Sequence, residues 1–211
     1  MKTSEAKTVI LSRISHALRD QPAVPSIPRA YRRHSSTAHH DVVNMLEDRL
    51  VDYKASVYRE DTTSLPERLR NLLRTEHTIV PDGLEHSWLP DGITIIRDRT
   101  PQGTTLSTRE LDAVGAVLTS STVSCAETGT IFLNANPAEG RRALSLVPDH
   151  HVCVVPLDTV VELIPEAFER VNHRKPITMI SGPSATSDIE LERVEGVHGP
   201  RRLDVVLLKR V

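Results

Sequence analysis

The sequence predicts an α/β protein with a mostly parallel sheet that helices cover on both faces, preceded by a helical extension at the N-terminus. Two observations support this fold class. Short apolar runs bounded by turn residues recur from residue 55 to residue 208. Segments with the apolar spacing of an α-helix separate several of these runs, and strands that alternate with helices are typical of a parallel sheet buried on both faces.

The N-terminal region, residues 1–40, is expected to be separate from the α/β domain at residues 41–211. Apolar residues between positions 9 and 18 recur at helical spacing, which predicts an amphipathic helix over residues 4–19. Three prolines within residues 21–28 predict an extended linker, since proline interrupts both helices and sheet ladders. Seven basic and two acidic side chains give residues 1–40 a net charge of +5, whereas the whole chain carries −2. A basic arm on an acidic body suits an acidic partner protein, or simple solubility, better than nucleic acid.

Strands of the α/β domain are predicted where apolar runs are bounded by turn residues. These runs lie at residues 55–58, 78–80, 93–96, 113–118, 130–133, 152–155, 177–180 and 205–208. A helix is predicted over residues 65–73, with Pro66 in its first turn. Another is predicted over residues 159–173, capped by Asp158 and kinked or divided by Pro165.

Composition excludes several classes of protein. With 211 residues, 38% of them hydrophobic and 26% charged, the chain suits an ordinary globular domain with an extension. The aromatic content of 3% argues against a surface that stacks the bases of single-stranded nucleic acid. No apolar run approaches the roughly 18 residues of a membrane span, and no secretory signal is visible, so we expect a cytoplasmic protein. Cys125 and Cys153 suit small buried residues in a reducing compartment better than a disulfide or a catalytic thiol.

The first candidate site follows the predicted strand at residues 177–180. Ligands of parallel sheets bind outside the carboxyl ends of strands, where loops pass into helices. Gly182 would permit a tight turn or the close approach of a ligand, and the polar residues after it would lie at a helix N-terminus, where free amides bind anions. These polar residues, with the serine that precedes the glycine, are Ser181, Ser184, Thr186 and Asp188. The same residue types are the commonest helix caps, so capping and ligand binding are equally supported.

The second candidate site precedes the predicted strand at residues 130–133. It brings together a carboxylate, two hydroxyls and a flexible glycine: Glu127, Thr128, Gly129 and Thr130. A desolvated Glu127 would serve as a nucleophile or a general base. The same carboxylate would equally accept hydrogen bonds from a neighbouring loop.

His198 is the best-placed histidine for proton transfer. Gly196 and Gly199 leave it accessible, and the ordinary pKa of a histidine lies near neutrality, although most loop histidines have no such role. The histidine pairs at residues 39–40 and 150–151 lack the spacing with cysteines or carboxylates that a metal site requires, so no bound metal is expected.

Four motifs, in this order, resemble the LUD-domain family of lactate-utilisation proteins. They are Ala-Glu-Thr-Gly-Thr at residues 126–130, the segment from Arg141 to Pro148 leading into His-His-Val at 150–152, Ile-Ser-Gly-Pro-Ser-Ala-Thr-Ser-Asp-Ile-Glu at 180–190 and Gly-Val-His-Gly-Pro at 196–200. The resemblance covers residues 40–211 and implies an α/β fold similar to the sugar-phosphate isomerase and CoA-transferase superfamily. It also implies a role in oxidising L-lactate to pyruvate alongside two partner proteins that carry iron–sulfur clusters. With two cysteines, this chain cannot itself supply the four thiolates of a usual cluster.

Together these motifs predict a small polar pocket at the carboxyl edge of the sheet. Glu127, Asp188 and His198 would orient an anionic ligand or move protons. The residues expected to contact the ligand are Thr128, Gly129, Thr130, Ser181, Gly182, Ser184, Thr186 and Gly199. The cofactor stays unknown, because the sequence offers a proton acceptor and no visible hydride acceptor. Two alternatives stay open: a phosphate-ester or acyl-CoA binder with Glu127 as the reactive carboxylate, and a non-catalytic subunit that organises the iron–sulfur partners.

Overall fold

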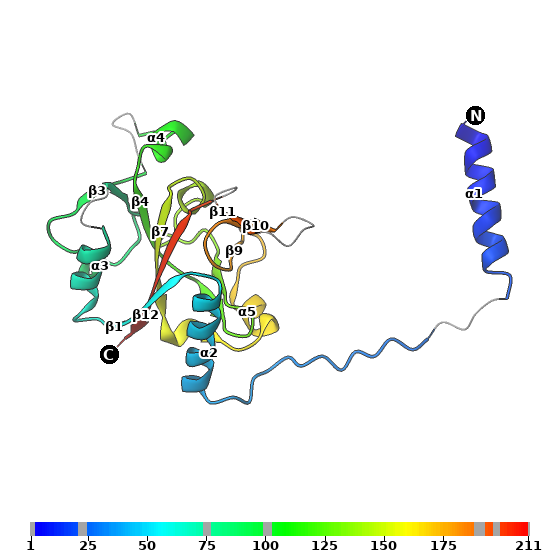
Figure 1. The fold of residues 1–211 in the computed structure, drawn as a ribbon, viewed down its shortest axis with the longest axis horizontal. Coiled ribbons are helices and arrows are strands. Elements are labelled where there is room, and N and C mark those ends of the chain that lie inside the picture. Colours follow the sequence, from blue (N-terminus) through cyan, green and yellow to red (C-terminus); the bar gives the residue numbers. More distant parts are fainter. Residues whose placement is uncertain are drawn as a thin grey trace. The chain divides into compact units, whose positions relative to one another are not determined.

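The computed structural model of the chain describes residues 3–20, 25–73, 77–98, 103–187, 193–195 and 199–210. The chain divides into two compact units, Met1–Arg32 and Arg33–Val211. The first unit contains helix α1 (Thr3–Ala17), where the sequence predicted a helix (Figure 1). The large apolar side chains of this helix, and of Leu18 just after it, are exposed: Val9, Ile10, Leu11, Ile14 and Leu18.

The second unit is built around a six-stranded sheet with the order β1-β12-β7-β4-β2-β3 (Figure 1). All of its neighbouring strands are parallel. Its strands are β1 (Ser56–Asp61), β12 (Arg202–Lys209), β7 (His150–Pro156), β4 (Ala116–Ser120), β2 (His77–Ile79) and β3 (Thr94–Ile96). The predicted α/β class with a mostly parallel sheet is confirmed.

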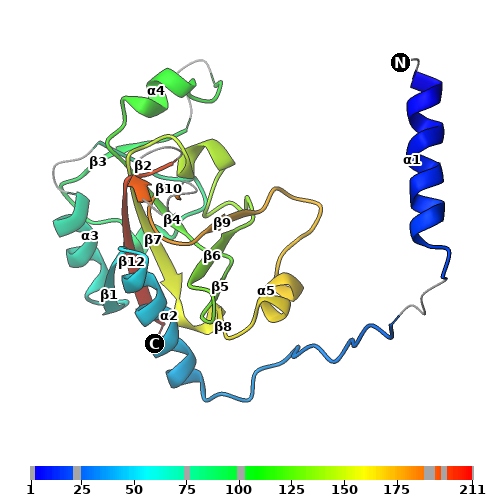
Figure 2. The same ribbon diagram turned by 45° about the vertical axis from the view of Figure 1, so that its right-hand side comes forward.

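Both faces of this sheet are covered, as the apolar runs of its strands require. Side chains alternate along β7, so that Val154 packs with the leucines of α3 (Leu65–Leu73) on one face. Val155 packs on the other face with the apolar side chains of α2 (His39–Asp52). Figure 2 shows α3 on one side of the sheet and strands β5, β6 and β9 on the other.

The second face also carries a smaller sheet, with the order β8-β5-β6-β9. Strand β6 is antiparallel to both of its neighbours, whereas β5 and β8 are parallel. These strands are β8 (Val160–Val161), β5 (Val123–Cys125), β6 (Thr130–Leu133) and β9 (Thr178–Ile180). Ile131 of β6 joins the core that α2 covers, and Phe132 packs on the opposite side with Ala167 of α5 (Ile164–Arg170).

The remaining elements are short. They are helix α4 (Thr108–Asp112), the 3-10 helices η1 (His86–Trp88), η2 (Arg142–Ser145) and η3 (Leu157–Thr159), and the antiparallel strands β10 (Ala185–Ser187) and β11 (Arg193–Glu195). Among the residues that the structure describes, no helix is long and apolar enough to cross a membrane.

The helix predicted over residues 159–173 is wrong in its first third. That stretch forms the end of η3 and strand β8, and the helix begins only at Ile164. Pro165 lies in its first turn, where a missing N–H costs nothing. The backbone N–H of Leu163 donates to Glu166 Oε2 at 2.9 Å, and Asp158 lies in η3 instead of capping the helix.

The helix start predicted after the strand at residues 177–180 is also wrong. Residues 185–187 form β10, which pairs with β11. No helix N-terminus therefore follows β9 within the described residues, and Asp188 lies outside them. The strand itself exists as β9, but it pairs antiparallel with β6 in the smaller sheet.

Candidate functional site

A cavity of about 210 Å³ lies between β9 and the amino-terminal parts of β7 and β12. His151 and Leu203, the second residues of β7 and β12, form one wall, and Thr178 and Ile180 of β9 form another. Four residues that the sequence predicted for the site also line it: Ser181, Gly182, Ser184 and Gly199.

This position corrects the predicted one, because the cavity lies at the amino edge of the six-stranded sheet and not at its carboxyl edge. The prediction assumed that the strand before Ser181 belongs to the parallel sheet. That strand is antiparallel to β6, and its loop leads back to the start of β12, where the Ser184 N–H donates to the Pro200 carbonyl at 2.8 Å. The loops at 181–184 and 199–200 are thereby held together.

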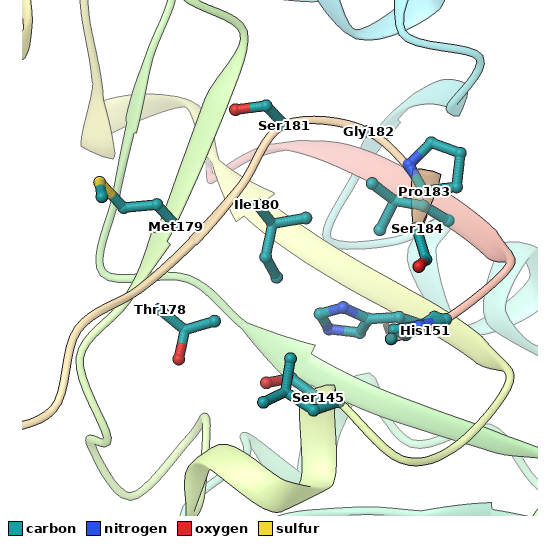
Figure 3. Close-up of a pocket in the computed structure, with 13 residues that line it drawn as sticks. Ser145, His151, Thr178, Met179, Ile180, Ser181, Gly182, Pro183 and Ser184 are labelled. Atoms are coloured by element: carbon teal, nitrogen blue, oxygen red, sulfur yellow. The ribbon is translucent and has the colours of Figure 1, made fainter. Parts of the chain in front are cut away.

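His151 is the central polar side chain of the cavity. It is 1% exposed, and its ring projects from β7 toward Thr178 and Ile180 (Figure 3). Its Nε2 lies 2.8 Å from Thr119 Oγ1, whereas its Nδ1 has no hydrogen-bond partner among the described residues. Burial, and to a lesser degree the electrostatic effect of His150, lowers the pKa of His151 to about 3. The imidazole is therefore neutral near pH 7, and offers one donor or one acceptor at Nδ1.

His150 faces the opposite side of the sheet, because successive side chains of a strand alternate. Its Nε2 lies 2.6 Å from Asp204 Oδ2, and Arg202 Nη2 lies 2.9 Å from the same oxygen. Burial by itself raises the pKa of Asp204. The hydrogen bond from His150 and the charges of His150 and Arg202 together lower the pKa by more than burial raises it, so that it lies below its usual value. The two adjacent histidines therefore belong to separate sites.

The two predicted motif loops meet beside the cavity. Thr130 Oγ1 lies 2.8 Å from Thr128 Oγ1 and 2.9 Å from Ser181 Oγ. This chain of hydroxyls joins the turn between β5 and β6 to the loop after β9. Of its three members, Ser181 lines the cavity.

The glycines of the two motif loops make room for the end of α2. Gly129 and Gly182 have φ angles of 59° and 83°, which disfavour other residues. A Cβ at Gly129 would lie 2.7 Å from Arg49 Cβ, and one at Gly182 would lie 2.6 Å from Tyr53 Cβ. Close packing on the end of α2 thus requires glycine at both positions, while Gly182 also lines the cavity.

The sequence model of the LUD domain family matches residues 30–208 of the chain. The chain belongs to the LUD domain family. A protein of Deinococcus radiodurans named Lactate utilization protein C is 41% identical to it over 213 residues, covering 98% of this chain and 97% of the relative. A Bacillus velezensis protein of the same name is 26% identical over 200 residues, covering 84% of this chain and 82% of the relative.

The solved structures include a similar fold. The crystal structure of a DUF162 family protein from Deinococcus radiodurans superposes with a TM-score of 0.71 at 37% identity. The match covers 82% of this LUD-domain chain and 99% of that structure.

Of the three predicted catalytic residues, Glu127 lies in the described part of the LUD domain. Glu127 is exposed and does not line the cavity, and its N–H donates to the Glu162 carbonyl at 3.0 Å. Asp188 and His198 lie outside the described residues. Thr186, which was predicted to contact the ligand, is the middle residue of strand β10.

Sequence reasoning missed His151 and its partner Thr119 as members of the site. The available signal was the alternation of β7, which makes one histidine of an adjacent pair face each side of the strand. The apolar run predicted a strand only from residue 152, so both histidines fell outside it.

The cysteines of the LUD domain are free and buried, as the sequence predicted. Burial raises the pKa of the Cys153 thiol to about 12, so this thiol stays protonated and unreactive near neutrality. Within the described ranges, no group of three or more His, Cys, Asp or Glu side chains could hold a metal ion.

The described lining of the cavity is polar and carries no charged side chain near pH 7. No aspartate, glutamate, lysine or arginine is among the described residues that line it, and its polar side chains are the hydroxyls of serines and a threonine together with the neutral imidazole of His151. Such a lining binds a small molecule by hydrogen bonds to hydroxyl or carbonyl oxygens. The described hydroxyls can hydrogen-bond a carboxylate without neutralising its charge, and the imidazole takes up no proton near pH 7.

Proposed function

We propose that this LUD-domain protein is a subunit of an L-lactate utilisation system, in which it supports the oxidation of L-lactate to pyruvate with two partner proteins that carry iron–sulfur clusters. The names of its relatives support a role in lactate utilisation, since a 41% identical protein that aligns with 98% of the chain is named Lactate utilization protein C. The clusters belong to the partners in this proposal, because this chain has only two cysteines and both are buried.

The observation that carries a ligand-binding role is the Nδ1 atom of His151, which is buried in the cavity wall without a partner among the described residues. A buried polar atom that makes no hydrogen bond costs about 1–3 kcal/mol, and a ligand that bonds to it recovers this free energy. The 2-hydroxyl of lactate and the keto oxygen of pyruvate both suit a neutral imidazole. His151 would orient the ligand, since a group with a pKa of about 3 accepts no proton near pH 7.

The test combines binding and electron transfer. His151→Phe keeps a planar ring but removes both ring nitrogens, so we expect lactate-dependent reduction of an acceptor dye by the reconstituted three-protein system to be lost. The thermal shift that lactate induces should disappear as well, whereas the chain without ligand should stay folded and lose only the roughly 1–3 kcal/mol that the missing hydrogen bond to Thr119 costs. His86→Phe is the matched control, because His86 is exposed in η1 away from the cavity. Unchanged dye reduction and thermal shift in His151→Phe would rule out the cavity as the ligand site.

The predicted catalytic residues need a separate test. Glu127→Gln and Asp188→Asn each keep the shape of the side chain and remove its charge, and His198→Gln removes the titratable imidazole. If these residues orient the ligand or move protons, each substitution should abolish lactate-dependent electron transfer at unchanged stability, and His198→Gln should alter the pH profile near neutrality. Retained activity with a lowered melting temperature would instead assign them to scaffolding.

A second candidate function is that of an assembly subunit that organises the iron–sulfur partners. Helix α1 favours it, because its large apolar side chains are exposed within the first unit. Removing this helix separates the two functions, since ligand binding in the cavity should survive the deletion while assembly should not.

A further inference from the structure

A second cavity, of about 490 Å³, lies at the opposite edge of the six-stranded sheet, beyond the carboxyl ends of β2 and β3. Asp82 and Gly83 follow β2 and Asp98 follows β3, while residues 135–141 contribute much of the remaining wall. Its volume falls within the range of about 300–1,000 Å³ that is typical of small-molecule sites. The cavity beside His151 is smaller.

The topology of the sheet singles out this edge. After β2, the chain adds β3 on one side of it. The next strand of this sheet, β4, pairs with the other side of β2, and β7 and β12 then follow in that opposite direction. The strand order thus reverses between β2 and β4. In open parallel sheets, ligands bind in the crevice outside the carboxyl ends of the strands at such a switch point.

An arginine held in a fixed orientation lines this switch-point cavity. Arg141 donates from Nε and Nη2 to the two carboxylate oxygens of Asp98, at 2.6 and 2.9 Å, and from Nη2 to the Leu106 carbonyl at 2.6 Å. The hydrogen bond to Asp98 raises the pKa of Arg141. Its Nη1 makes no hydrogen bond to any described residue, so two N–H donors of a charged and oriented guanidinium are left for a ligand.

Lys175 adds a second cationic group. It lines the same cavity, its side chain is exposed, and it forms no ion pair with the described residues. The wall also contains two acidic residues, Asp82 and Asp98, and Asp98 is already paired with Arg141. Arg141 Nη1 and Lys175 Nζ are the cationic donors of this wall that form no hydrogen bond or ion pair with a described residue.

The wall formed by residues 134–140 is held in place without a ligand. The carboxylate of Glu139 accepts from Asn134 N at 2.6 Å, from Asn136 N at 3.2 Å and from Thr122 Oγ1 at 2.6 Å. On the facing loop, Gly83 N donates to the Pro137 carbonyl at 3.0 Å, and a Cβ at Gly83 would collide with Pro137. The cavity is thus preformed, as ligand sites usually are.

We propose that the switch-point cavity binds a small organic anion through its oxyanion group, held by Arg141 Nη1 and Lys175 Nζ. Arginine and lysine bind carboxylate and phosphate oxygens by charge-assisted hydrogen bonds. The oxyanion belongs either to a small hydroxy or oxo acid or to a phosphate group. This site differs from the uncharged cavity beside His151, which offers no described cation to an anion.

Isothermal titration calorimetry of the full chain tests this site with four probes used singly: L-lactate, pyruvate, inorganic phosphate and adenosine monophosphate. We expect at least one probe to bind, with an affinity that falls at higher salt. Arg141→Gln should raise its Kd by roughly tenfold or more and Lys175→Gln by roughly threefold or more, since each variant removes a charge-assisted hydrogen bond. Lys209→Gln, at the exposed end of β12, should leave the Kd unchanged.

Three outcomes overturn the proposal: no probe binds, both variants bind like Lys209→Gln, or binding is lost in His151→Phe alone. Loss of binding in His151→Phe alone would place the anion in the cavity beside His151, and the proposed role in lactate utilisation would still stand. Because Arg141→Gln also breaks the pair with Asp98, its fold is checked by circular dichroism. Lys175→Gln keeps the test decisive if that variant unfolds, since its side chain has no ion-pair partner among the described residues.

Discussion

His150 Nε2 and Asp204 Oδ2 lie 2.6 Å apart between the adjacent strands β7 and β12, and both side chains are almost fully buried. The pair lies on the face of the sheet that α3 covers, whereas the cavity lies on the other face. It therefore supports the strands that form the cavity wall without contributing to the cavity. Its substitution should affect stability before it affects ligand binding.

Asp204→Asn should lower the free energy of unfolding by about 1.5–3 kcal/mol, because the buried carboxylate bonds to His150 and Arg202 and hydrogen bonds to a charged group contribute about this much. Urea unfolding measures this loss. The matched control is Asp149→Asn, whose partner Arg201 lies at 2.6 Å on the surface. That substitution should cost only about 0–1 kcal/mol. Equal losses in the two variants would show that burial of the His150–Asp204 pair is unimportant.

The same pair predicts a dependence on acid. The pKa of Asp204 in the folded chain lies below its ordinary value of 3.8, so its stabilising contribution is present above that pH and is lost as the pH falls through the lower, folded pKa. The difference in free energy of unfolding between the wild type and Asp204→Asn should therefore shrink below pH 3.8. Urea titrations from pH 5 down to pH 2 test this, and a difference that stays constant would contradict it.

Gly182→Ala should lower the free energy of unfolding by more than the roughly 1–2 kcal/mol that a left-handed backbone costs an alanine. The excess arises because the new Cβ would lie 2.6 Å from Tyr53 Cβ and 2.7 Å from its carbonyl oxygen. Gly92→Ala is the matched control, since Gly92 has nearly the same φ, 85° against 83°, with no atom near the added Cβ. If the two variants melt at the same temperature, the contact with α2 adds nothing.

Glu139→Gln should gain stability relative to the wild type as the pH rises. Burial raises the pKa of Glu139 above its ordinary value of 4.5, although hydrogen bonds from Thr122, Asn134 and Asn136 oppose it. The folded chain therefore holds this proton more tightly than the unfolded chain, and the wild type loses stability from pH 4.5 upward to the folded pKa. Glutamine has no proton to lose. Urea unfolding of both proteins between pH 4 and pH 7 measures the trend, and the opposite trend would show that the carboxylate form is favoured.

Deletion of residues 1–28 should leave the melting temperature of the second unit nearly unchanged, because α1 belongs to a separate compact unit. Assembly with the iron–sulfur partners should weaken, and more so at low salt, where a basic arm contributes most. Thermal melting and co-sedimentation at two salt concentrations check both expectations. A large loss of stability in the isolated chain would show that the apolar side chains of α1 pack on their own domain.

Local sequence patterns predicted the elements better than their arrangement. Helix α3 and strand β6 have the predicted bounds, because proline in a first turn and an apolar run before a turn are local signals. Helix α2 was missed although Val42, Leu46 and Leu50 share a face at helical spacing, since its short apolar stripe lies among charged residues. Its burial is decided by distant strands.

The sequence predicted the candidate site only in part, again because local patterns do not show how distant strands pair. The loops that contain Thr130 and Ser181 do meet, at 2.9 Å between their hydroxyl oxygens. The edge of the sheet was wrong, because a short apolar run such as residues 177–180 reads the same in a parallel and an antiparallel strand. Only the long-range pairing of β9 with β6 decides its direction.

The adjacent histidines of β7 also set a limit on how this chain can change length. Inserting one residue before Val152 would move every preceding side chain of the strand to the other face. The inserted residue would then take the place of His151 in the cavity wall, and the cavity imidazole would meet the buried carboxylate of Asp204. Insertions should therefore be tolerated in the proline-rich segment before α2, but not at the start of β7, where a shift by a single position exchanges two unrelated chemical environments.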